Sequence, residues 1–384
     1  MSFGLLALIG AIALLGPLLA LPRGLGVPVV IGEVAAGLAI GGSGLDLFDT
    51  TDPTATFLAD LGFALVMFEA GTHVPVRDPH LRSGIRRGAA RCVAIGVLAA
   101  LVAAAIDRVF HTDHLGLYAV LMASSSAAVI MPIIESRKLS GPAIVEMLPQ
   151  IALADAACIV ALPLVIDPPR AESAAGGSVA VIALTVVAYG LLRYMKASGL
   201  RKKVHTVSED RRFALELRID LVVLFALAAL AVTTHVSIML AGFALGVAVA
   251  AVGEPRRLAR QVFGVTEGFF GPYYFVWLGA SLNLDALWAH PSMIGLGLTL
   301  GVGAVVVHAA MWVTGQPVAV GALTAAQLGV PVSAVTLGTQ LDLFGPAEGP
   351  AILLGALVTL AVASLVRPRD GAPRTGRSRG AATG

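Results

Sequence analysis

The chain has 384 residues, of which 57% are hydrophobic and only 13% are charged. A soluble domain carries roughly a quarter charged residues, so this composition excludes a water-soluble globular protein and indicates an integral membrane protein. The formal net charge of +2 excludes the strong positive field of a nucleic-acid-binding protein. Cys92 and Cys158 lie in apolar runs, so we expect neither a disulfide framework nor a structural metal site.

Apolar runs long enough to cross a bilayer follow one another along nearly the whole chain. A crossing helix needs about 20 mostly apolar residues. The first run has no basic segment before it, which favours a first membrane span over a cleaved signal peptide. Breaking the runs at Pro, Gly and charged clusters predicts thirteen spans: 3–21, 25–41, 56–74, 88–107, 115–135, 142–166, 177–195, 213–233, 236–252, 260–281, 293–314, 320–344 and 349–366.

The basic residues predict the orientation of these spans. Lys and Arg in short loops collect on the cytoplasmic side of a membrane. With the N-terminus outside and the C-terminus in the cytoplasm, every Lys and Arg falls inside except Arg108 and Arg170, which lie outside, and Arg218, which lies within a span. We therefore expect a multi-pass protein of a bacterial inner membrane with this orientation.

The span count also predicts the domain organisation, an all-α polytopic membrane protein with one transmembrane domain at 1–369. Thirteen spans divide into six, a linker span and six, so the two halves would be inverted repeats. The first repeat would occupy 3–166, the linker helix 177–195 and the second repeat 213–366. Residues 370–384 are rich in Arg, Gly and Ala and are predicted to be a disordered cytoplasmic tail.

Two spans in matching positions of the halves contain residues that interrupt helices. Interrupted helices at corresponding places are the best sequence indication of a transport site, because their freed backbone groups must face a cavity or packed protein. Alternatively, the small residues only allow close helix packing. The residues are Ser124, Ser125, Ser126 and Pro132 in 115–135, and Gly329, Pro331, Ser333 and Gly338 in 320–344.

Asp155 is the first candidate for ion transport. It lies near the middle of span 142–166 with no basic residue nearby in sequence. A charge inside the membrane is costly, so intramembrane carboxylates mark functional sites, and here a proton and a cation would compete for one group. The structural alternative is a carboxyl hydrogen-bonded to a neighbouring hydroxyl within the helix packing.

Three further titratable residues are candidates for proton-linked roles. Glu33 lies in the middle of the second span and Glu69 in the inner half of the third, and each has a structural alternative as a packing or funnel residue. His308 lies deep in the second half, where no Lys or Arg occurs between Arg260 and Arg367. Its titration range suits pH sensing, although a neutral core histidine is the simpler interpretation. Glu267, near the start of the tenth span, could line a vestibule, although solvation at the membrane interface is the simpler interpretation.

The sequence contains none of the motifs that would indicate an enzyme. It has no Gly-x-x-x-x-Gly-Lys-Ser/Thr loop for ATP, no Gly-x-Ser-x-Gly and no His-Glu-x-x-His pattern. We therefore expect a transporter driven by an ion gradient, with no cofactor and no resident metal.

Several segments resemble the second branch of the monovalent cation:proton antiporter superfamily, which contains the Kef-like and bacterial sodium/proton exchangers. Each segment alone is a weak signature, but together they follow the family order along nearly the whole chain. They are GLGVPVVIGEVAAGL at 24–38 with GGSGL at 41–45, LADLG at 58–62 with MFEAG at 67–71, SSSAAV at 124–129, HVSIMLAGF at 235–243 and FVWLGASLNL at 275–284.

The resemblance implies thirteen spans in inverted repeats, crossed discontinuous helices, a homodimer and alternating access by a mobile core. By position, Asp155 corresponds to the family's ion-carrying aspartate. The preceding position is usually polar in the family and is Ala154 here. A single carboxylate carries one proton or one monovalent cation, which predicts electroneutral one-for-one exchange.

The predicted function is therefore exchange of Na+ or K+ for protons. Asp155 would be the carrier, and the hydroxyls of Ser124, Ser125 and Ser126 would supply further oxygens to the ion or its surroundings. Two alternatives remain open on related scaffolds: a gated potassium efflux channel and a proton-coupled symporter for an organic anion. A membrane sensor that has lost transport is a third, which Ala154 keeps open.

Overall fold

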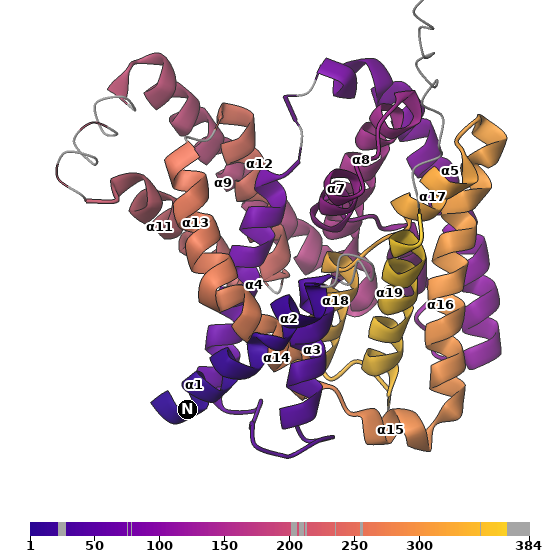
Figure 1. Cartoon of the computed structure of the whole chain (residues 1–384). Coiled ribbons are helices and arrows are strands. Elements are labelled where there is room, and N and C mark those ends of the chain that lie inside the picture. Colours follow the sequence, from indigo (N-terminus) through magenta and orange to yellow (C-terminus); the bar gives the residue numbers. More distant parts are fainter. Residues whose placement is uncertain are drawn as a thin grey trace, which may run out of the picture.

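The computed structural model in Figure 1 describes residues 1–21, 28–74, 76–77, 79–200, 206, 211, 213–234, 236–253, 256–345 and 347–366. These residues form helices and connecting turns and contain no β-strand. The predicted tail at 370–384 lies outside the described residues. The all-α architecture predicted from the sequence is confirmed for the part that is described.

The helices follow one another along the described part of the chain. Their bounds are α1 Phe3–Ala13, α2 Leu15–Ala20, α3 Val29–Ile40, α4 Pro53–Thr72, α5 Pro79–Phe110, α6 Leu115–Ala123, α7 Ala127–Ser136, α8 Pro142–Ile166, the 3-10 turn η1 Pro168–Arg170, α9 Ala171–Ala197, α11 Leu215–Thr233, α12 Ile238–Val252, α13 Arg256–Val265, the π-helical turn η2 Thr266–Phe270, α14 Gly271–Ser281, α15 Leu284–Ala289, α16 Pro291–Ala309, the 3-10 turn η3 Ala310–Thr314, α17 Val318–Thr324, α18 Gly329–Gln340 and α19 Glu348–Ser364.

Each predicted span overlaps one of these helices or a pair of them. By length and apolar composition, seven helical stretches among the described residues are able to cross a membrane, and three shorter apolar helices accompany them. Local signals set many of the boundaries. At the start of α4, for example, Asp52 accepts hydrogen bonds from the amides of Thr54 and Ala55, and Pro53 occupies the first helical position. The count of thirteen spans stays a prediction.

The helices pack into two groups. The first group contains α1–α4, α9 and α11–α14, and within it α4 packs along α12 and α3 along α14. The second contains α5–α8 and α16–α19, in which α5 packs on α6 and α8, and α16 packs on α19. Figure 1 shows α4, α9 and α12 on one side of the molecule and α5, α8 and α16 on the other. The groups meet along α8, and a cavity lies between them.

Glycines allow the helices of the first group to touch through their backbones. A Cβ atom at Gly246 on α12 would lie 2.1 Å from the carbonyl oxygen of Phe68 on α4, and one at Gly37 on α3 would lie 2.0 Å from that of Val276 on α14. Neither position has room for a side chain. Close contact of this kind is typical of membrane helices, where dispersion forces between backbones replace the hydrophobic effect.

Two helices are broken, as the sequence predicted. The first break, at 124–126, separates α6 from α7, and the second, at 325–328, separates α17 from α18. The second break precedes the residues expected to form it. Pro331 lies in the first turn of α18, where a missing amide proton costs nothing, and Gly338 lies inside the same helix. Pro132 is likewise inside α7.

Candidate functional site

The two helix breaks cross each other. Extended backbone at a break leaves amide and carbonyl groups without helical partners, and inside a membrane domain other protein groups must satisfy them. Here each break supplies partners to the other. Ser126 N donates to Ala326 O (2.9 Å), Ser125 Oγ donates to Thr324 O (2.7 Å), and the Ser124 hydroxyl bonds the Gln327 side chain.

Asp155 lies beside this crossing. It projects from α8 with only 6% of its side chain exposed, and its Oδ2 accepts a hydrogen bond of 3.2 Å from the amide of Ala127. Ala127 is the first residue of α7, so the carboxylate sits at the positive end of a half-helix that begins at the break. No ion pair joins Asp155 to any Lys, Arg or His among the described residues.

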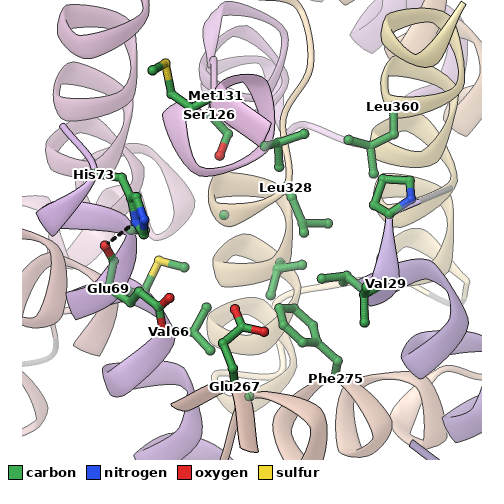
Figure 2. Close-up of a pocket in the computed structure, with 18 of the residues that line it drawn as sticks. Val29, Val66, Glu69, His73, Ser126, Met131, Glu267, Phe275, Leu328 and Leu360 are labelled. Atoms are coloured by element: carbon green, nitrogen blue, oxygen red, sulfur yellow. Dashed lines mark hydrogen bonds between the residues drawn. The ribbon is translucent and has the colours of Figure 1, made fainter. Parts of the chain in front are cut away.

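A cavity of about 980 Å³ connects Asp155 with acidic residues of the other helix group. Asp155 and Ser126 line it on the side of α7 and α8, and Glu33, Glu69 and Glu267 line it on the side of α3, α4 and η2. In Figure 2 the Ser126 hydroxyl points into the cavity from one wall, while the carboxylates of Glu69 and Glu267 approach it from the opposite wall. The cavity therefore has a buried carboxylate on each side.

A family model described as the transmembrane sodium/hydrogen exchanger matches residues 10–368. The chain belongs to the sodium/hydrogen exchanger family. Its fold is similar to that of the sodium proton antiporter MjNhaP1 from Methanocaldococcus jannaschii at pH 8, with a TM-score of 0.63 and 15% identity over 94% of this chain and 95% of that one.

A sequence relative comes from Bacillus subtilis (strain 168), where YjbQ is named as a candidate Na(+)/H(+) antiporter. The two proteins are 24% identical over 308 residues, a match that covers 76% of this chain and 50% of YjbQ. The chain thus spans about half the length of this curated relative. The family resemblance inferred from the sequence motifs is confirmed.

In this exchanger-family chain the three serines of the first break have different surroundings. Ser126 lines the cavity with Asp155, whereas the hydroxyls of Ser124 and Ser125 bond residues of the second break. The structure therefore brings one of the three predicted hydroxyls to the cavity. The other two hydroxyls hold the crossing together, and they affect Asp155 only by fixing its position.

His308 lies away from the cavity in a buried polar network. It is fully buried, and its Nδ1 lies 3.0 Å from Thr324 Oγ1, which also accepts from Gln150 Nε2 at 3.3 Å. The Thr324 hydroxyl also lies 2.8 Å from Gly321 O, so it is shared among three partners. Gln316 Nε2 extends the network to Gln150 Oε1 at 3.1 Å.

The sequence analysis did not single out Gln150, Gln316, Thr324 or Gln327. The available signal was that Gln150, Thr324 and Gln327 are polar residues inside predicted spans, whereas Gln316 falls between two of them. Their role depends on which helices lie next to each other, and hydropathy carries no information about that. The network joins α8, α16 and α17 directly behind the crossing, so it supports the geometry at Asp155.

Glu33 and Glu69 both line the cavity, where the sequence analysis left them open to structural or proton-linked roles. Glu33 is 4% exposed and Glu69 is 9% exposed. The carbonyl oxygen of Glu69 is hydrogen-bonded to His73 Nδ1 at 2.9 Å, which brings the imidazole to the same wall (Figure 2).

Glu267 is an exposed residue that lines the cavity (Figure 2). This position agrees with the vestibule role that the sequence left open beside solvation at the interface. The π-helical turn η2 sets which helix face residues 266–270 present, and such a turn has no simple signature in sequence.

Proposed function

We propose that the chain exchanges Na+ or K+ for protons by alternating access, with Asp155 as the shared carrier. The observation that carries this proposal is the position of Asp155. It is a buried carboxylate without an ion pair in the described structure, beside two crossed helix breaks, on the wall of a large cavity. Membership of the exchanger family and the fold shared with MjNhaP1 support it.

The chemistry at Asp155 follows from its surroundings. An isolated carboxylate removed from water is strongly destabilised, so Asp155 is expected to hold either a proton or a cation. The Ala127 amide stabilises the ionised form, in which the carboxylate binds a cation. The Ser126 hydroxyl at the cavity supplies a further hard oxygen ligand. Proton and cation then exclude each other, which couples their movement in opposite directions.

One carboxylate at the crossing favours one-for-one, electroneutral exchange. The residue before Asp155 is Ala154, which offers no second acidic group at that position. The basic residues of the second half are also absent between Arg260 and Arg367, so no fixed positive charge compensates a second cation. The charge carried in each direction is therefore one.

Alternating access requires the two helix groups to move relative to each other. The broken helices and Asp155 belong to the second group, while α3, α4 and η2 form the facing wall. Movement of the second group across this wall would close the cavity on one side and open it on the other. Inverted repeats, a homodimer, an outside N-terminus and a cytoplasmic C-terminus in a bacterial inner membrane complete the proposal.

The test is pH-dye fluorescence in proteoliposomes that receive pulses of Na+, K+ or Li+ at clamped membrane potential. We expect cation-dependent proton movement in the wild type, and background signal in Asp155→Asn. The matched control is Asp285→Asn, an exposed aspartate on the short helix α15, which should transport normally.

The outcomes separate the parts of the proposal. A silent but folded wild type would contradict exchange and favour the channel or sensor alternatives. Full exchange by Asp155→Asn would contradict the carrier assignment. A rate that depends on membrane potential would contradict one-for-one stoichiometry alone.

A further inference from the structure

Glu33 is a buried carboxylate with no partner in the described structure. Only 4% of its side chain is exposed, and it makes no hydrogen bond and no ion pair with any described residue. It lines the same cavity as Asp155, but from the opposite wall. A buried acidic group in this condition requires a ligand or a proton to offset its charge.

The position of Glu33 is fixed by a close helix crossing. A Cβ atom at Gly16 on α2 would lie 2.7 Å from Glu33 Cγ, and one at Gly32 would lie 2.6 Å from the Cα atom of Gly16. These contacts hold the stem of Glu33 against α2. The close packing of α2 against α3 therefore sets where the Glu33 side chain enters the cavity.

The π-helical turn η2 brings two more oxygen-bearing side chains to this wall. Glu267 lines the cavity and its negative charge acts on Glu33. Thr266 also lines the cavity, is only 2% exposed, and its Oγ1 is buried without a hydrogen bond in the described structure. Turns of π-helix occur frequently at functional sites. Two carboxylates that repel each other and a hydroxyl without a hydrogen bond thus line the same cavity wall.

This combination of groups suits a small monovalent cation. The three groups are hard oxygen ligands, which exclude a soft metal ion. Among the described residues, no set of three His, Cys, Asp or Glu is placed to hold a metal ion together, so a divalent ion lacks the ligands that it needs. A single positive charge between Glu33 and Glu267 removes their repulsion.

We propose that Glu33, Glu267 and the Thr266 hydroxyl form a second binding site for a monovalent cation, separate from Asp155 and on the opposite wall of the cavity. The site binds a cation when Asp155 already holds one, and also when the Asp155 carboxylate is removed by substitution. The proposal rests on the proposed function for the identity of the ion, and on geometry for the existence of the site.

Protons compete with the cation at this site, and the charged groups that face it set how strongly. From α4 and its end these are Glu69 and His73, and from the second helix group they are Asp155 and Arg137, all of which line the cavity. Protonation of either carboxylate removes the negative charge that attracts the cation, so low pH weakens cation binding at this site.

The test measures equilibrium binding of ²²Na+ and of ⁸⁶Rb+, as a substitute for K+, to the purified full-length protein at alkaline pH. Asp155→Asn serves as the background, because it removes the carrier site. We expect the Asp155→Asn variant to keep one saturable site. Adding Glu33→Gln to this background should abolish that site, and adding Glu267→Gln should weaken binding at least tenfold. The control Glu172→Gln, on the exposed first turn of α9, should bind as the background does.

The outcomes distinguish the second site from the carrier site at Asp155. No saturable binding of either ion to Asp155→Asn would overturn the second site and leave the carrier role of Asp155 intact. Binding unaffected by both Glu33→Gln and Glu267→Gln would also overturn it. Transport and binding both unchanged in Asp155→Asn would instead overturn the carrier assignment. Since Glu267 is accessible from the cavity, Glu267→Gln tests the site even where Glu33→Gln fails to fold.

Discussion

The buried polar groups on the two walls of the cavity differ in their hydrogen bonding. At the crossing of the helix breaks, Ser125, Gln150 and Thr324 each bond a group on another helix. On the facing wall, Glu33 and Thr266 are equally buried, yet their side chains have no hydrogen bond within the described structure. Burying a polar group without a partner costs free energy, so a group that persists in this state is usually there for a ligand.

The comparison separates polar groups that build the site from those that bind at it. Side chains at the crossing hold irregular backbone in one arrangement, and their removal should lower stability. On the facing wall, the Glu33 carboxylate and the Thr266 hydroxyl hold no other group in place, and their removal should lower binding. Substitutions that keep the shape of the side chain distinguish the two cases.

Thr324→Val should give the largest effect on stability. Valine has the same shape but leaves Gln150 Nε2 and His308 Nδ1 without their hydrogen-bond partner, which costs about 1–3 kcal/mol. Thermal unfolding followed by intrinsic fluorescence should show the loss. Thr299→Val is the matched control, because that exposed hydroxyl bonds only its own helix at Gly295 O. Equal losses of unfolding temperature in the two variants would contradict a structural role of the network.

His114→Gln should give a smaller effect that depends on pH. His114, at the start of α6, lies 2.6 Å from Glu348 Oε1 on α19, and this hydrogen bond raises the pKa of the imidazole above its ordinary 6.5. A raised pKa means that the contact stabilises the fold fully below pH 6.5, and that this contribution is lost as the pH rises through the higher value.

Thermal unfolding at a series of pH values measures this contribution. The wild type should lose stability between neutral and alkaline pH, and His114→Gln should lose less over the same interval. The exposed His290 provides the control His290→Gln, which should follow the wild type. A wild type whose unfolding temperature is constant across the interval would contradict the role of this contact.

Thr266→Val should give the smallest change in stability, within about 0.5 kcal/mol, because its hydroxyl is already without a partner. In the Asp155→Asn background, the same substitution should weaken ²²Na+ binding several-fold. A loss of stability as large as that of Thr324→Val would show that the hydroxyl has a structural partner, and the difference between the two walls would disappear.

The sequence predicted those parts of the molecule that depend on local composition. Hydropathy located the helices, and serine-rich and glycine-rich positions indicated which two helices are broken. Asp155 was identifiable because a carboxylate is rare inside an apolar span. The second break was displaced to 325–328, because Pro331 is well tolerated in the first turn of a helix and therefore marks a helix start and not its interruption.

Features that depend on helix neighbours were not predictable from the sequence. The side-chain partners of Gln150 lie on α17 and in the loop after η3, and nothing in the local sequence pairs them. The sequence placed Glu267 near the start of a span, which left both a vestibule and the interface open. Its position in the cavity follows from the π-helical turn and from the packing of η2 against α4.

The π-helical turn at Thr266–Phe270 also makes the second cavity wall sensitive to chain length. A turn of this kind holds one residue more than an α-helical turn, and each residue of an α-helix rotates the chain by about 100°. Deleting one glycine, such as Gly268, would restore regular helix and turn Glu267 away from the cavity while Asp155 stays where it is. Loss of a single codon can thus remove Glu267 from this wall on an otherwise unchanged scaffold.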